Sequence, residues 1–524
     1  LNYDPEECSE LNEYDGEKEQ YKVDRGKEWK KWFFDTESYK GRIRDLNVEE
    51  KMKECVRKRD KKGYDALKHK LYKRIHKPYM ACAISDAGET RASGLETGKY
   101  NATQRCMDIV AKKALLIAHN CNYDYRFFQK HLYCIDQKTR GSGLMNATAR
   151  YMSWKQNKTE LRLQFKDSLK LIAMPLRSFG GCFGLKQEKE VMPYDLYTYK
   201  NLRDNWIEIK KAKGYFHKDG EYEQFVKNCK KIGILKSIDG KKVFNMMKYS
   251  EYYCMKDCIV LKQGYETFRG WVLDQIDIDV DGVWTIASLA DKYMKKNGVY
   301  DGVYQLAGVP QLFIQKCVVG GRTMCRDNVK WTFDGTKNGK DKGKRMADYD
   351  GVSLYPSSMN RMEGCLIGRP KILQDSQKNY DFLSSCDGYF VKIKILDVGI
   401  NRHFSLMSEV NENGVRVFHN NMEEKIMYVD KTTLEDLITF QDVKFEVLLG
   451  YYYDEGRNPL ISSVIEKIFK LRLKLKAQKN KAQMVYKLIM NSAYGKTILK
   501  PINTEEAIVS DKDKDKFLRD NYNY

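Results

Sequence analysis

The sequence lacks the features of several common protein classes. No apolar run reaches the ~20 residues that span a membrane, and residues 1–15 are polar and acidic, unlike a signal peptide, so we expect no membrane partner. The close cysteine pairs Cys254/Cys258 and Cys317/Cys325 have no C-x-x-C partner and no nearby histidine, which argues against a structural zinc. There is no internal repeat. We expect a reduced, intracellular protein in a compartment that the sequence does not specify; its first residue is Leu, which is compatible with a start inside a longer chain.

What the sequence does have is positive charge. The 524 residues carry a formal net charge of +21, with 42% hydrophobic and 12% aromatic residues, which are globular values. A chain of this length exceeds the usual limit of one hydrophobic core, so we expect two or three domains. A large positive surplus on a folded chain favours a polyanionic partner such as nucleic acid. The alternative is that the positive charge only keeps the surface well hydrated and binds no partner.

Apolar and charged segments alternate along the chain. Residues 40–78 predict a basic, helical insertion, residues 209–242 form a lysine-rich surface stretch, and residues 335–344 (GTKNGKDKGK) predict an exposed hairpin loop. The run ALLIA at 114–118 is typical of a buried strand, and residues 464–490 have helical periodicity. The fold class predicted from this alternation is mixed α/β.

Acidic side chains stand out at three places in the first half. Asp35 and Glu37 follow the run WFF, and on a strand their side chains would point to the same side. Asp124 follows a second apolar run, and Tyr253 and Asp257 have the i,i+4 spacing of one helical face. Two divalent cations held by carboxylates can supply a hydroxide nucleophile and stabilise a leaving oxyanion, and a phenol can hydrogen-bond the attacking water. Taken one at a time, these motifs are equally compatible with capped turns and core tyrosines.

The order D-x-E, N-x-x-Y-D, Y-x-x-x-D resembles the Exo I, Exo II and Exo III motifs of family B DNA polymerases. The resemblance implies an RNase H-like 3′-5′ exonuclease domain in which Asp35, Glu37, Asp124 and Asp257 bind metal and Tyr253 contacts the water. Residues 167–172 (DSLKLI) are similar to the S/T-L-x-x-h element that grips the primer end in protein-primed members. The single-stranded DNA ligands that the resemblance implies are Ser38, Asn120, Tyr123, Ser168 and Leu169, with the Tyr123 ring offering a stacking face.

Two motifs in the second half resemble the polymerase site of the same family. Residues 350–356 (DGVSLYP) match motif A, D-x-x-S-L-Y-P, after an alternating stretch that predicts a strand ending at Asp350. The resemblance implies that Asp350 and the Gly351 carbonyl bind two Mg²⁺ ions and that Tyr355 excludes a ribose 2′-OH. Nucleotidyl transfer needs such a carboxylate, because two Mg²⁺ ions activate the primer 3′-OH and neutralise the departing pyrophosphate.

Residues 487–495 (KLIMNSAYG) match motif B, K-x-x-x-N-S-x-Y-G, and Lys487, Asn491 and Tyr494 recur on one helical face. A lysine can meet a triphosphate as a point charge, and an aromatic edge can read base-pair shape. Arg472, in a basic stretch upstream, is a second candidate for triphosphate contact. Gly495 closes the motif and is a candidate DNA contact.

Two departures from the family pattern affect the interpretation. Residues 318–322 (VVGGR) stand where the family has a Y-x-G-G/A loop that contacts DNA; Gly320 and Gly321 allow close approach to phosphate, but Val318 replaces the tyrosine. Motif C, Y-x-D-T-D, which normally follows motif B and supplies further aspartates, does not occur. We therefore expect a C-terminally incomplete chain. A split or polymerase-inactive protein is the less economical explanation, since motifs A and B are intact.

The spacing of the motifs implies a layout and a branch of the family. Motifs A and B are separated by about 130 residues, enough for the terminal-protein insertion of protein-primed polymerases. The S-L element favours the same branch, with an RNA- or DNA-primed viral enzyme as the alternative. The expected regions are an N-terminal segment (1–28), the exonuclease domain (29–268, insertion 40–78), a connecting region (269–330), the palm with motif A (331–364), the terminal-protein insertion (365–460), the fingers (461–498) and the start of the remaining palm (499–524). The partial palm and the fingers would form a right-hand polymerase domain.

Three functions fit the sequence. The favoured one is a DNA-directed DNA polymerase with a proofreading 3′-5′ exonuclease. It would use two Mg²⁺ per active site, with Mn²⁺ as a substitute, together with dNTPs, a DNA primer-template, single-stranded DNA ends and a terminal priming protein, to replicate a viral or plasmid genome. The second is an exonuclease and DNA-binding protein without polymerase activity, because motif C is absent. The third is a non-catalytic basic nucleic-acid-binding or scaffolding protein, which leaves the ordered carboxylates unexplained.

Overall fold

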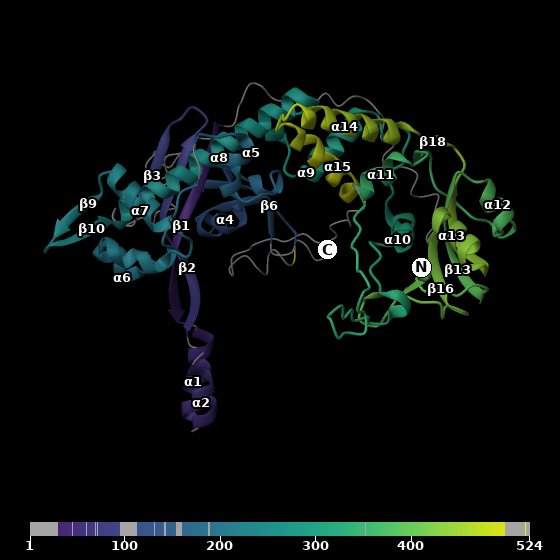
Figure 1. Cartoon of the computed structure of the whole chain (residues 1–524), viewed down its shortest axis with the longest axis horizontal. Coiled ribbons are helices and arrows are strands. Elements are labelled where there is room, and N and C mark those ends of the chain that lie inside the picture. The colour runs from purple at the N-terminus through teal and green to yellow at the C-terminus, as the bar shows by residue number, and fades with distance from the viewer. Residues whose placement is uncertain are drawn as a thin grey trace. The chain divides into compact units, whose positions relative to one another are not determined.

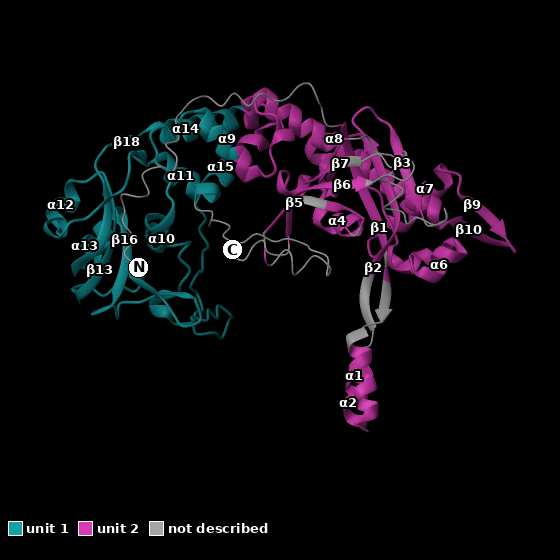
Figure 2. Ribbon diagram, turned by 180° about the vertical axis from the view of Figure 1, so that it is seen from behind, with its two compact units in different colours: residues 1–21, 290–474, 490–497 teal, residues 22–289, 475–489, 498–524 magenta. Residues whose placement is uncertain are grey.

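The computed structural model describes residues 30–44, 46–58, 60–68, 70, 72–94, 113–129, 131–140, 143–152, 160–186, 189–351, 353–497 and 519. The chain forms two compact units (Figure 2): unit 1 comprises residues 1–21, 290–474 and 490–497, and unit 2 comprises residues 22–289, 475–489 and 498–524. The expected N-terminal segment and nearly all of the expected final palm segment lie outside the described residues. No helix in the described ranges is long and apolar enough to cross a membrane.

Unit 2 is built on a seven-stranded sheet with the order β3-β2-β1-β4-β7-β6-β5. The strands β3, β2 and β1 are antiparallel, whereas β1, β4 and β7 are parallel, and β7, β6 and β5 are antiparallel again. The first five strands in this order have the arrangement of the RNase H-like fold. The strands are β1 (Lys30–Arg44), β2 (Tyr72–Ser85), β3 (Thr90–Gly94), β4 (Lys113–Ala118), β5 (Tyr133–Arg140), β6 (Gly143–Met152) and β7 (Glu160–Asp167).

The core of unit 2 follows from the alternation of side chains along β1. Trp32 and Phe34 point into one cluster with β4, β6, β7 and helix α4 (Cys121–Gln129). Phe33 points to the other face, where its ring meets Tyr265 of helix α8 (Met246–Ile276) edge to face at 5.6 Å. Each of these aromatic side chains is at most 1% exposed. Since the apolar core covers both faces of the sheet, the register of β1 is fixed, and with it the direction of Asp35 and Glu37.

Smaller elements surround the sheet of unit 2. The strands β8 (Trp206–Glu208), β9 (Leu235–Ile238) and β10 (Lys241–Asn245) form a separate sheet in the order β8-β10-β9. Asn245 caps α8 by accepting a hydrogen bond from the backbone N of Lys248 at 2.9 Å, which defines where this long helix begins. Three further α-helices of unit 2 are α5 (Phe179–Phe183), α6 (Tyr199–Asp204) and α7 (Glu221–Lys231).

The helical insertion predicted at 40–78 is only partly helical. Strand β1 continues to Arg44 and β2 begins at Tyr72, so the two strands form a long antiparallel ribbon that leads to helices α1 (Leu46–Arg57) and α2 (Lys61–Lys68) (Figure 1). The expectation of helix was wrong at both ends of this segment. Its basic composition masked the strands, which pair with each other and therefore need no apolar periodicity to form.

Unit 1 contains a second, smaller core. A four-stranded antiparallel sheet has the order β12-β17-β13-β16 and packs against α13 (Lys431–Gln441) around Val391, Ile393 and Leu434, all fully buried. The strands are β12 (Lys371–Ile372), β13 (Gly388–Val398), β16 (Ile426–Asp430) and β17 (Val443–Tyr453). Shorter pairs are β11 (Cys365–Leu366) with β18 (Arg457–Asn458) and β14 (Ser408–Val410) with β15 (Arg416–Phe418), and α12 (Tyr380–Ser385) lies between β12 and β13 in sequence.

The helical periodicity predicted at 464–490 corresponds to two helices, α14 (Leu460–Ala477) and α15 (Gln483–Thr497), with a break between them at which Lys479 has a φ of 55°. Three more described helices precede α14 in the sequence: α9 (Ile286–Lys296), α10 (Gly308–Cys317) and α11 (Leu354–Asn360).

The strand predicted to end at Asp350 does not form. Residues 329–351 contain no assigned strand, and Asp350 is exposed. A strand requires a hydrogen-bonded neighbour, and none of the described residues pairs with this segment. Residues 335–344 are an exposed turn region, held by a backbone hydrogen bond from Asp341 N to Asp334 O at 3.0 Å, without the flanking strands of a true hairpin.

Candidate active sites

Strand β1 brings the first two predicted carboxylates to one side of the sheet. Glu37 is 7% exposed and Asp35 is half-buried, and both share the face of Phe33. The pairing with β2 shifts register between Glu37 and Ser38. A bulge at this point re-aims the side chains that follow it, so Ser38 lies at the mouth of a cavity rather than continuing the regular alternation.

Asp124 reaches the same place from helix α4. Strands β4 and β7 are parallel and end together, with Ala118 opposite Asp167, and the Asp167 carboxylate accepts the backbone N of Asn120 at 2.9 Å. This contact fixes the turn in which Asn120 has a φ of 70°, and α4 begins immediately after it. Asp124 then accepts hydrogen bonds from the backbone N and the hydroxyl of Thr36, at 3.2 and 2.5 Å.

Helix α8 supplies the remaining predicted pair. Tyr253 and Asp257 are 1% and 2% exposed and lie on the helix face that meets β1. The Tyr253 hydroxyl is hydrogen-bonded to the hydroxyl of Tyr194, and Asp257 forms an ion pair with Lys189. The nitrogen of Lys189 also lies 5.0 Å from the centre of the Tyr253 ring.

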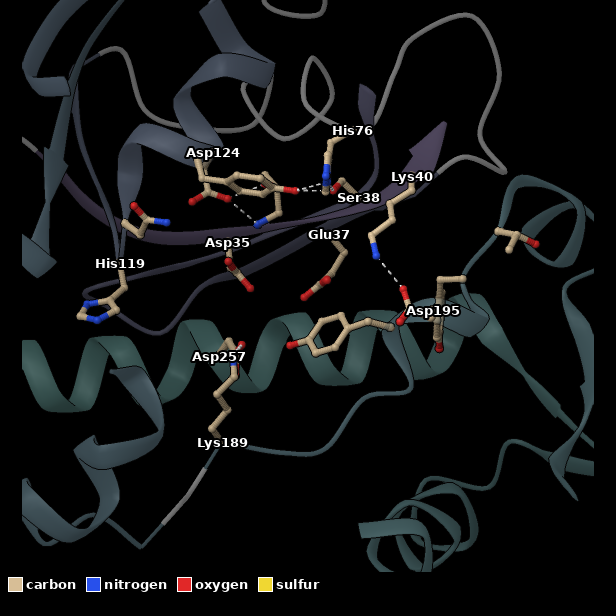
Figure 3. A pocket seen from close by; sticks show the side chains of 16 residues that line it. Asp35, Glu37, Ser38, Lys40, His76, His119, Asp124, Lys189, Asp195 and Asp257 are labelled. Atoms are coloured by element: carbon tan, nitrogen blue, oxygen red, sulfur yellow. Dashed lines mark hydrogen bonds and ion pairs between the residues drawn. The ribbon is translucent and has the colours of Figure 1, made fainter. Parts of the chain in front are cut away.

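The four predicted carboxylates line one cavity of about 610 Å³ (Figure 3). Tyr253 is not among the lining residues, but its hydroxyl is hydrogen-bonded to that of Tyr194, which lines the cavity. The structure thus brings together Asp35, Glu37, Asp124 and Asp257, which lie far apart in the sequence, as predicted. It also adds residues that the sequence analysis missed, because no motif or periodicity marks them. The lining residues that were not predicted are Thr36, Lys40, His76, His119, Lys189, Tyr194, Asp195, Tyr197 and Thr198.

Three side chains form a hydrogen-bonded group at the mouth of the cavity. The hydroxyls of Ser38 and Tyr123 lie 2.5 Å apart, and Nδ1 of His76 is 2.8 Å from the Tyr123 hydroxyl and 3.1 Å from that of Ser38. Ser38 and Tyr123 were predicted as DNA ligands, and both line the cavity together with Asn120. Their role in binding stays a prediction.

Ser168 and Leu169 do not line this cavity. Ser168 is fully buried, and its hydroxyl donates to the carbonyl of Ala118 at 3.0 Å and lies 2.9 Å from Nδ1 of His119. In this arrangement Ser168 supports the turn between β4 and α4, and the direct contact with DNA predicted for Ser168 and Leu169 stays a prediction.

The carboxyl groups of the cavity lie close together and away from water, which raises their pKa values. Burial raises the pKa of Asp124 to about 7 despite the opposing hydrogen bonds from Thr36, and it raises the pKa of Asp257 to about 6 despite the charge of Lys189. Burial and the neighbouring negative charges also raise the pKa values of Asp35 and Glu37 well above their ordinary range. Burial lowers the pKa of Lys189, but the charges of Asp257, Tyr194 and Asp35 and the hydrogen bond to Asp257 together raise it above its ordinary value.

This donor set fits divalent cations. One ligand atom from each of Asp35, Glu37 and Cys254 lies within 4.8 Å of the others. The Oδ1 atom of Asp257 is buried and has no hydrogen-bond partner, although its other oxygen contacts Lys189. A carboxylate oxygen left unpaired beside other acids is unfavourable unless a cation neutralises it. The hard oxygen donors match Mg²⁺ or Mn²⁺.

The raised pKa values predict how the stability of the protein depends on pH. The folded pKa values of about 7 for Asp124 and about 6 for Asp257 exceed the value of about 3.9 expected in the unfolded chain. The stability linked to these groups is therefore present below about pH 4 and is lost as pH rises through about 6 and 7. Without metal, the melting temperature should fall between about pH 4 and pH 7, and Mg²⁺ should restore it at the higher pH.

Thermal melts with EDTA or Mg²⁺ check this expectation, with Asp257→Asn as the comparison because it removes one titrating group at constant volume. As pH rises, the free energy of unfolding should fall more in the wild-type chain than in the variant. The difference should reach up to about 3 kcal/mol if the whole pKa shift of Asp257 contributes to stability. Parallel pH profiles for the wild-type chain and the variant would contradict the assignment.

Tyr355 of motif A and Tyr494 of motif B meet within unit 1. The rings of Tyr355 and Tyr494 are stacked, with centroids 4.2 Å apart and planes at 18°. A Cβ atom placed on Gly321 would lie 3.4 Å from the Tyr355 hydroxyl, so the glycine loop lies against motif A as well. Motif A, motif B and the glycine loop therefore converge on Tyr355, although they were recognised separately in the sequence.

The other predicted nucleotide and DNA ligands lie on several elements. Lys487 and Asn491 are exposed on α15, on the face that leads to Tyr494, and Gly495 is half-buried on the same helix. Arg472 is half-buried on α14, Gly320 is exposed, and Asp350 and Gly351 lie in the segment without secondary structure before α11. The roles of these residues stay predictions.

The fold of this chain is similar to that of a solved DNA polymerase. Phi29 DNA polymerase complexed with primer-template DNA aligns with 90% of this chain and 68% of its own chain, at a TM-score of 0.54 and 14% identity. Phi29 DNA polymerase complexed with single-stranded DNA aligns over the same shares at a TM-score of 0.52. The chain thus has the mixed α/β fold of a polymerase that combines an RNase H-like exonuclease domain with a polymerase domain, which confirms the predicted fold class.

The sequence comparisons define the family. The family "DNA polymerase type B, organellar and viral" matches residues 105–523. A DNA polymerase of Kluyveromyces lactis is 23% identical over 429 residues, which are 78% of this chain and 40% of that protein. A probable DNA polymerase of Neurospora intermedia is 23% identical over 375 residues, 69% of this chain and 36% of that protein. This chain belongs to the organellar and viral type B DNA polymerases, and it spans well under half the length of these curated relatives.

Proposed function

We propose that the cavity of unit 2 removes nucleotides from the 3′ end of single-stranded DNA. The observation that carries the proposal is the convergence of Asp35, Glu37, Asp124 and Asp257 on one cavity, with Tyr253 hydrogen-bonded to the lining residue Tyr194. A phosphodiester is an anion, so this acidic cavity requires cations if it is to bind one. A pair of Mg²⁺ ions held by the carboxylates would supply nucleophile activation and charge neutralisation.

The residues around the carboxylates have separable tasks in this proposal. Burial raises the pKa of Tyr253 well above its ordinary value, so its phenol stays protonated and can donate a hydrogen bond to the attacking water or to the phosphate. Lys189 places a positive charge next to Asp257, where a phosphate oxygen would need one. Ser38, Tyr123 and His76 offer hydroxyl and ring surfaces at the mouth for the sugar and base of the DNA end.

The direct test uses single-stranded DNA labelled at its 5′ end. The chain should shorten this DNA from the 3′ end in the presence of Mg²⁺, giving a ladder of labelled products, and EDTA should stop the reaction. A DNA whose 3′ end is blocked by a phosphorothioate linkage controls for contaminating endonucleases, since they would still cut inside it. Intact DNA after incubation with Mg²⁺ or Mn²⁺ would refute the proposal.

From motifs A and B we propose DNA-directed DNA synthesis. The stacking of Tyr355 on Tyr494 supports this, because it joins the residue proposed to exclude a ribose 2′-OH to the residue proposed to read the base pair. Asp350 and the Gly351 carbonyl would hold two Mg²⁺ ions, and Lys487 would meet the triphosphate of the dNTP, with Arg472 as a second cation. Proofreading follows if the same DNA end can reach both sites.

We further propose that synthesis starts on a protein primer. The support is the position of the sheet β12-β17-β13-β16 and α13, which lies between motifs A and B where the terminal-protein insertion was expected. The test supplies one labelled dNTP, template and the proteins encoded by the same genetic element. Label attached to protein after denaturation supports protein priming, and label confined to DNA primers excludes it.

A further inference from the structure

A buried thiol lies directly against the carboxylates of the nuclease cavity. Cys254 follows Tyr253 on α8, is fully buried, and its Sγ donates a weak hydrogen bond to the backbone carbonyl of Asp35 at 3.3 Å. Its Sγ lies within 4.8 Å of ligand oxygens of both Asp35 and Glu37, and these are also within 4.8 Å of each other. Among the described residues, Asp35, Glu37 and Cys254 are the group of acidic and thiol side chains whose spacing suits a metal ion.

The position of this thiol follows from how α8 packs on the sheet. One turn further along the helix, Cys258 is also fully buried, but its Sγ donates to the carbonyl of Cys82 on β2 at 3.4 Å. The thiols of Cys254 and Cys258 are hydrogen-bonded to each other, and both lie beside Cys82. Of the two, Cys254 is the one whose Sγ has the spacing of a metal group with Asp35 and Glu37.

A second observation points to a cation at the same place. Asp257, one turn after Tyr253, is 2% exposed, and its Oδ1 atom has no hydrogen-bond partner. The view in Figure 3 shows Asp257 directed from α8 toward Asp35 and Glu37. An unpaired buried carboxylate oxygen beside two further carboxylates and a thiol is an arrangement that a metal ion would satisfy.

We propose that Cys254 is a metal ligand and that it gives the site of Asp35 and Glu37 a second binding mode, for thiophilic divalent cations such as Zn²⁺ or Cd²⁺. This inference rests on the proposed nuclease function for the Mg²⁺ mode of the same carboxylates. Magnesium takes oxygen ligands and has little use for sulfur, whereas zinc is bound by thiolate and carboxylate in tetrahedral sites. Binding replaces the S–H bond of Cys254 by a sulfur–metal bond and releases one proton to solvent.

The second binding mode has a functional consequence. Asp35, Glu37 and Cys254 supply three ligands, and Oδ1 of Asp257 or a water can supply the fourth of a tetrahedral site. A cation held in this way occupies both carboxylates of β1, which the proposed Mg²⁺ mode also needs. Zn²⁺ therefore competes with Mg²⁺ and holds the nuclease site in an inactive state, so that the thiol acts as an inhibitory metal switch.

The test is a titration of the full chain with Cd²⁺ under reducing conditions, followed by the ultraviolet charge-transfer absorption that a cadmium–thiolate bond produces. The wild-type chain should show one more tight thiolate site than Cys254→Ser, which should bind Cd²⁺ at this site at least about tenfold more weakly. Cys229→Ser is the matched control: it removes a thiol of equal burial on helix α7, outside the group of Asp35, Glu37 and Cys254, and should leave the absorption at this site unchanged. Asp35→Asn should weaken the Cd²⁺ site without removing any thiol.

The outcomes separate this inference from the proposed function. Equal Cd²⁺ absorption and affinity in the wild-type chain and in Cys254→Ser would overturn the inference, even if the chain trims DNA with Mg²⁺. A Cd²⁺ site that depends on Cys254, in a chain that neither binds Mn²⁺ nor trims DNA, would support the inference and refute the proposed nuclease. Circular dichroism of each variant shows whether a lost signal comes from misfolding, and the Asp35→Asn titration then decides with all thiols present.

Discussion

Replacing Asp257 by alanine is expected to lower the rate of 3′-end hydrolysis by on the order of a thousandfold, about 4 kcal/mol of activation free energy. Asp257 is buried on α8, faces Asp35 and Glu37 across the cavity, and has one oxygen free for a cation. Its loss removes a ligand and leaves Lys189 without its ion-pair partner inside the cavity. The measurement is the initial rate of shortening of 5′-labelled single-stranded DNA at saturating Mg²⁺.

A matched control for this prediction lies in the same cavity. Asp195 also lines it, but its side chain is 62% exposed and pairs with Lys40 at the mouth. Asp195→Ala should change the rate by less than about tenfold, because an exposed ion pair contributes little. Asp257→Asn serves as the volume-preserving version of the main variant. A rate within a few-fold of wild type in both Asp257 variants would show that the cavity is not the hydrolytic site.

The sequence contained enough information to predict the carboxylate site because each member lies on a regular element. Asp35 and Glu37 share a face because strand residues two apart always do, and Tyr253 and Asp257 share one because helix residues four apart do. Asp124 follows a buried strand, so its place near a sheet end could be predicted as well. The fold class followed from the same alternation of apolar strands and helices, and the family from the order of the motifs.

The remaining features depend on contacts that no local pattern records. Lys189 lies in a segment without strand or helix, and only the tertiary fold brings it to Asp257. The contact of Cys254 with β1 depends on the rotation of α8, which is set by packing of side chains such as Tyr265 on Phe33. The ribbon of β1 and β2 was mistaken for helix because its sequence is basic and irregular. In each case the deciding interaction is long-range, so local propensity could not reveal it.

Before Asp350, the local sequence pattern predicted a strand that the structure does not form. The alternating sequence before Asp350 suits a strand, but a strand is stable only beside a partner, and no described segment pairs with residues 329–350. Tyr494 and Gly321 nevertheless both lie against Tyr355, which are contacts that the sequence analysis did not predict. The contacts among motif A, motif B and the glycine loop therefore form even though the segment that carries Asp350 is not held in a sheet.

Replacing Asp350 by alanine is accordingly expected to abolish template-directed DNA synthesis, by a factor on the order of a thousand or more, while 3′-end trimming continues. Asp350 is the carboxylate of motif A, and its loss removes the ligand through which both proposed Mg²⁺ ions would contact the primer end and the triphosphate. Trimming should survive because its carboxylates belong to unit 2, whereas Asp350 belongs to unit 1. The synthesis assay uses a chain that also carries a motif C, whose aspartates the reaction needs, with primer-template and dNTPs.

Two comparisons make this last prediction decisive. Lys487→Ala should raise the KM for dNTP by about tenfold and leave measurable synthesis at saturating nucleotide, because a lysine contributes charge to binding rather than holding the metals. Asp348→Ala is the matched control, since Asp348 is an exposed acid in the same segment outside the motif. If Asp350→Ala still extends primers at the wild-type rate, Asp350 does not hold the metal ions of the synthesis site. If the wild-type chain itself fails to extend primers while Asp257→Ala has lost trimming, the protein is a nuclease whose second unit binds DNA without polymerising it. If synthesis is lost and trimming is kept, the two metal sites act independently, as their separate carboxylates require.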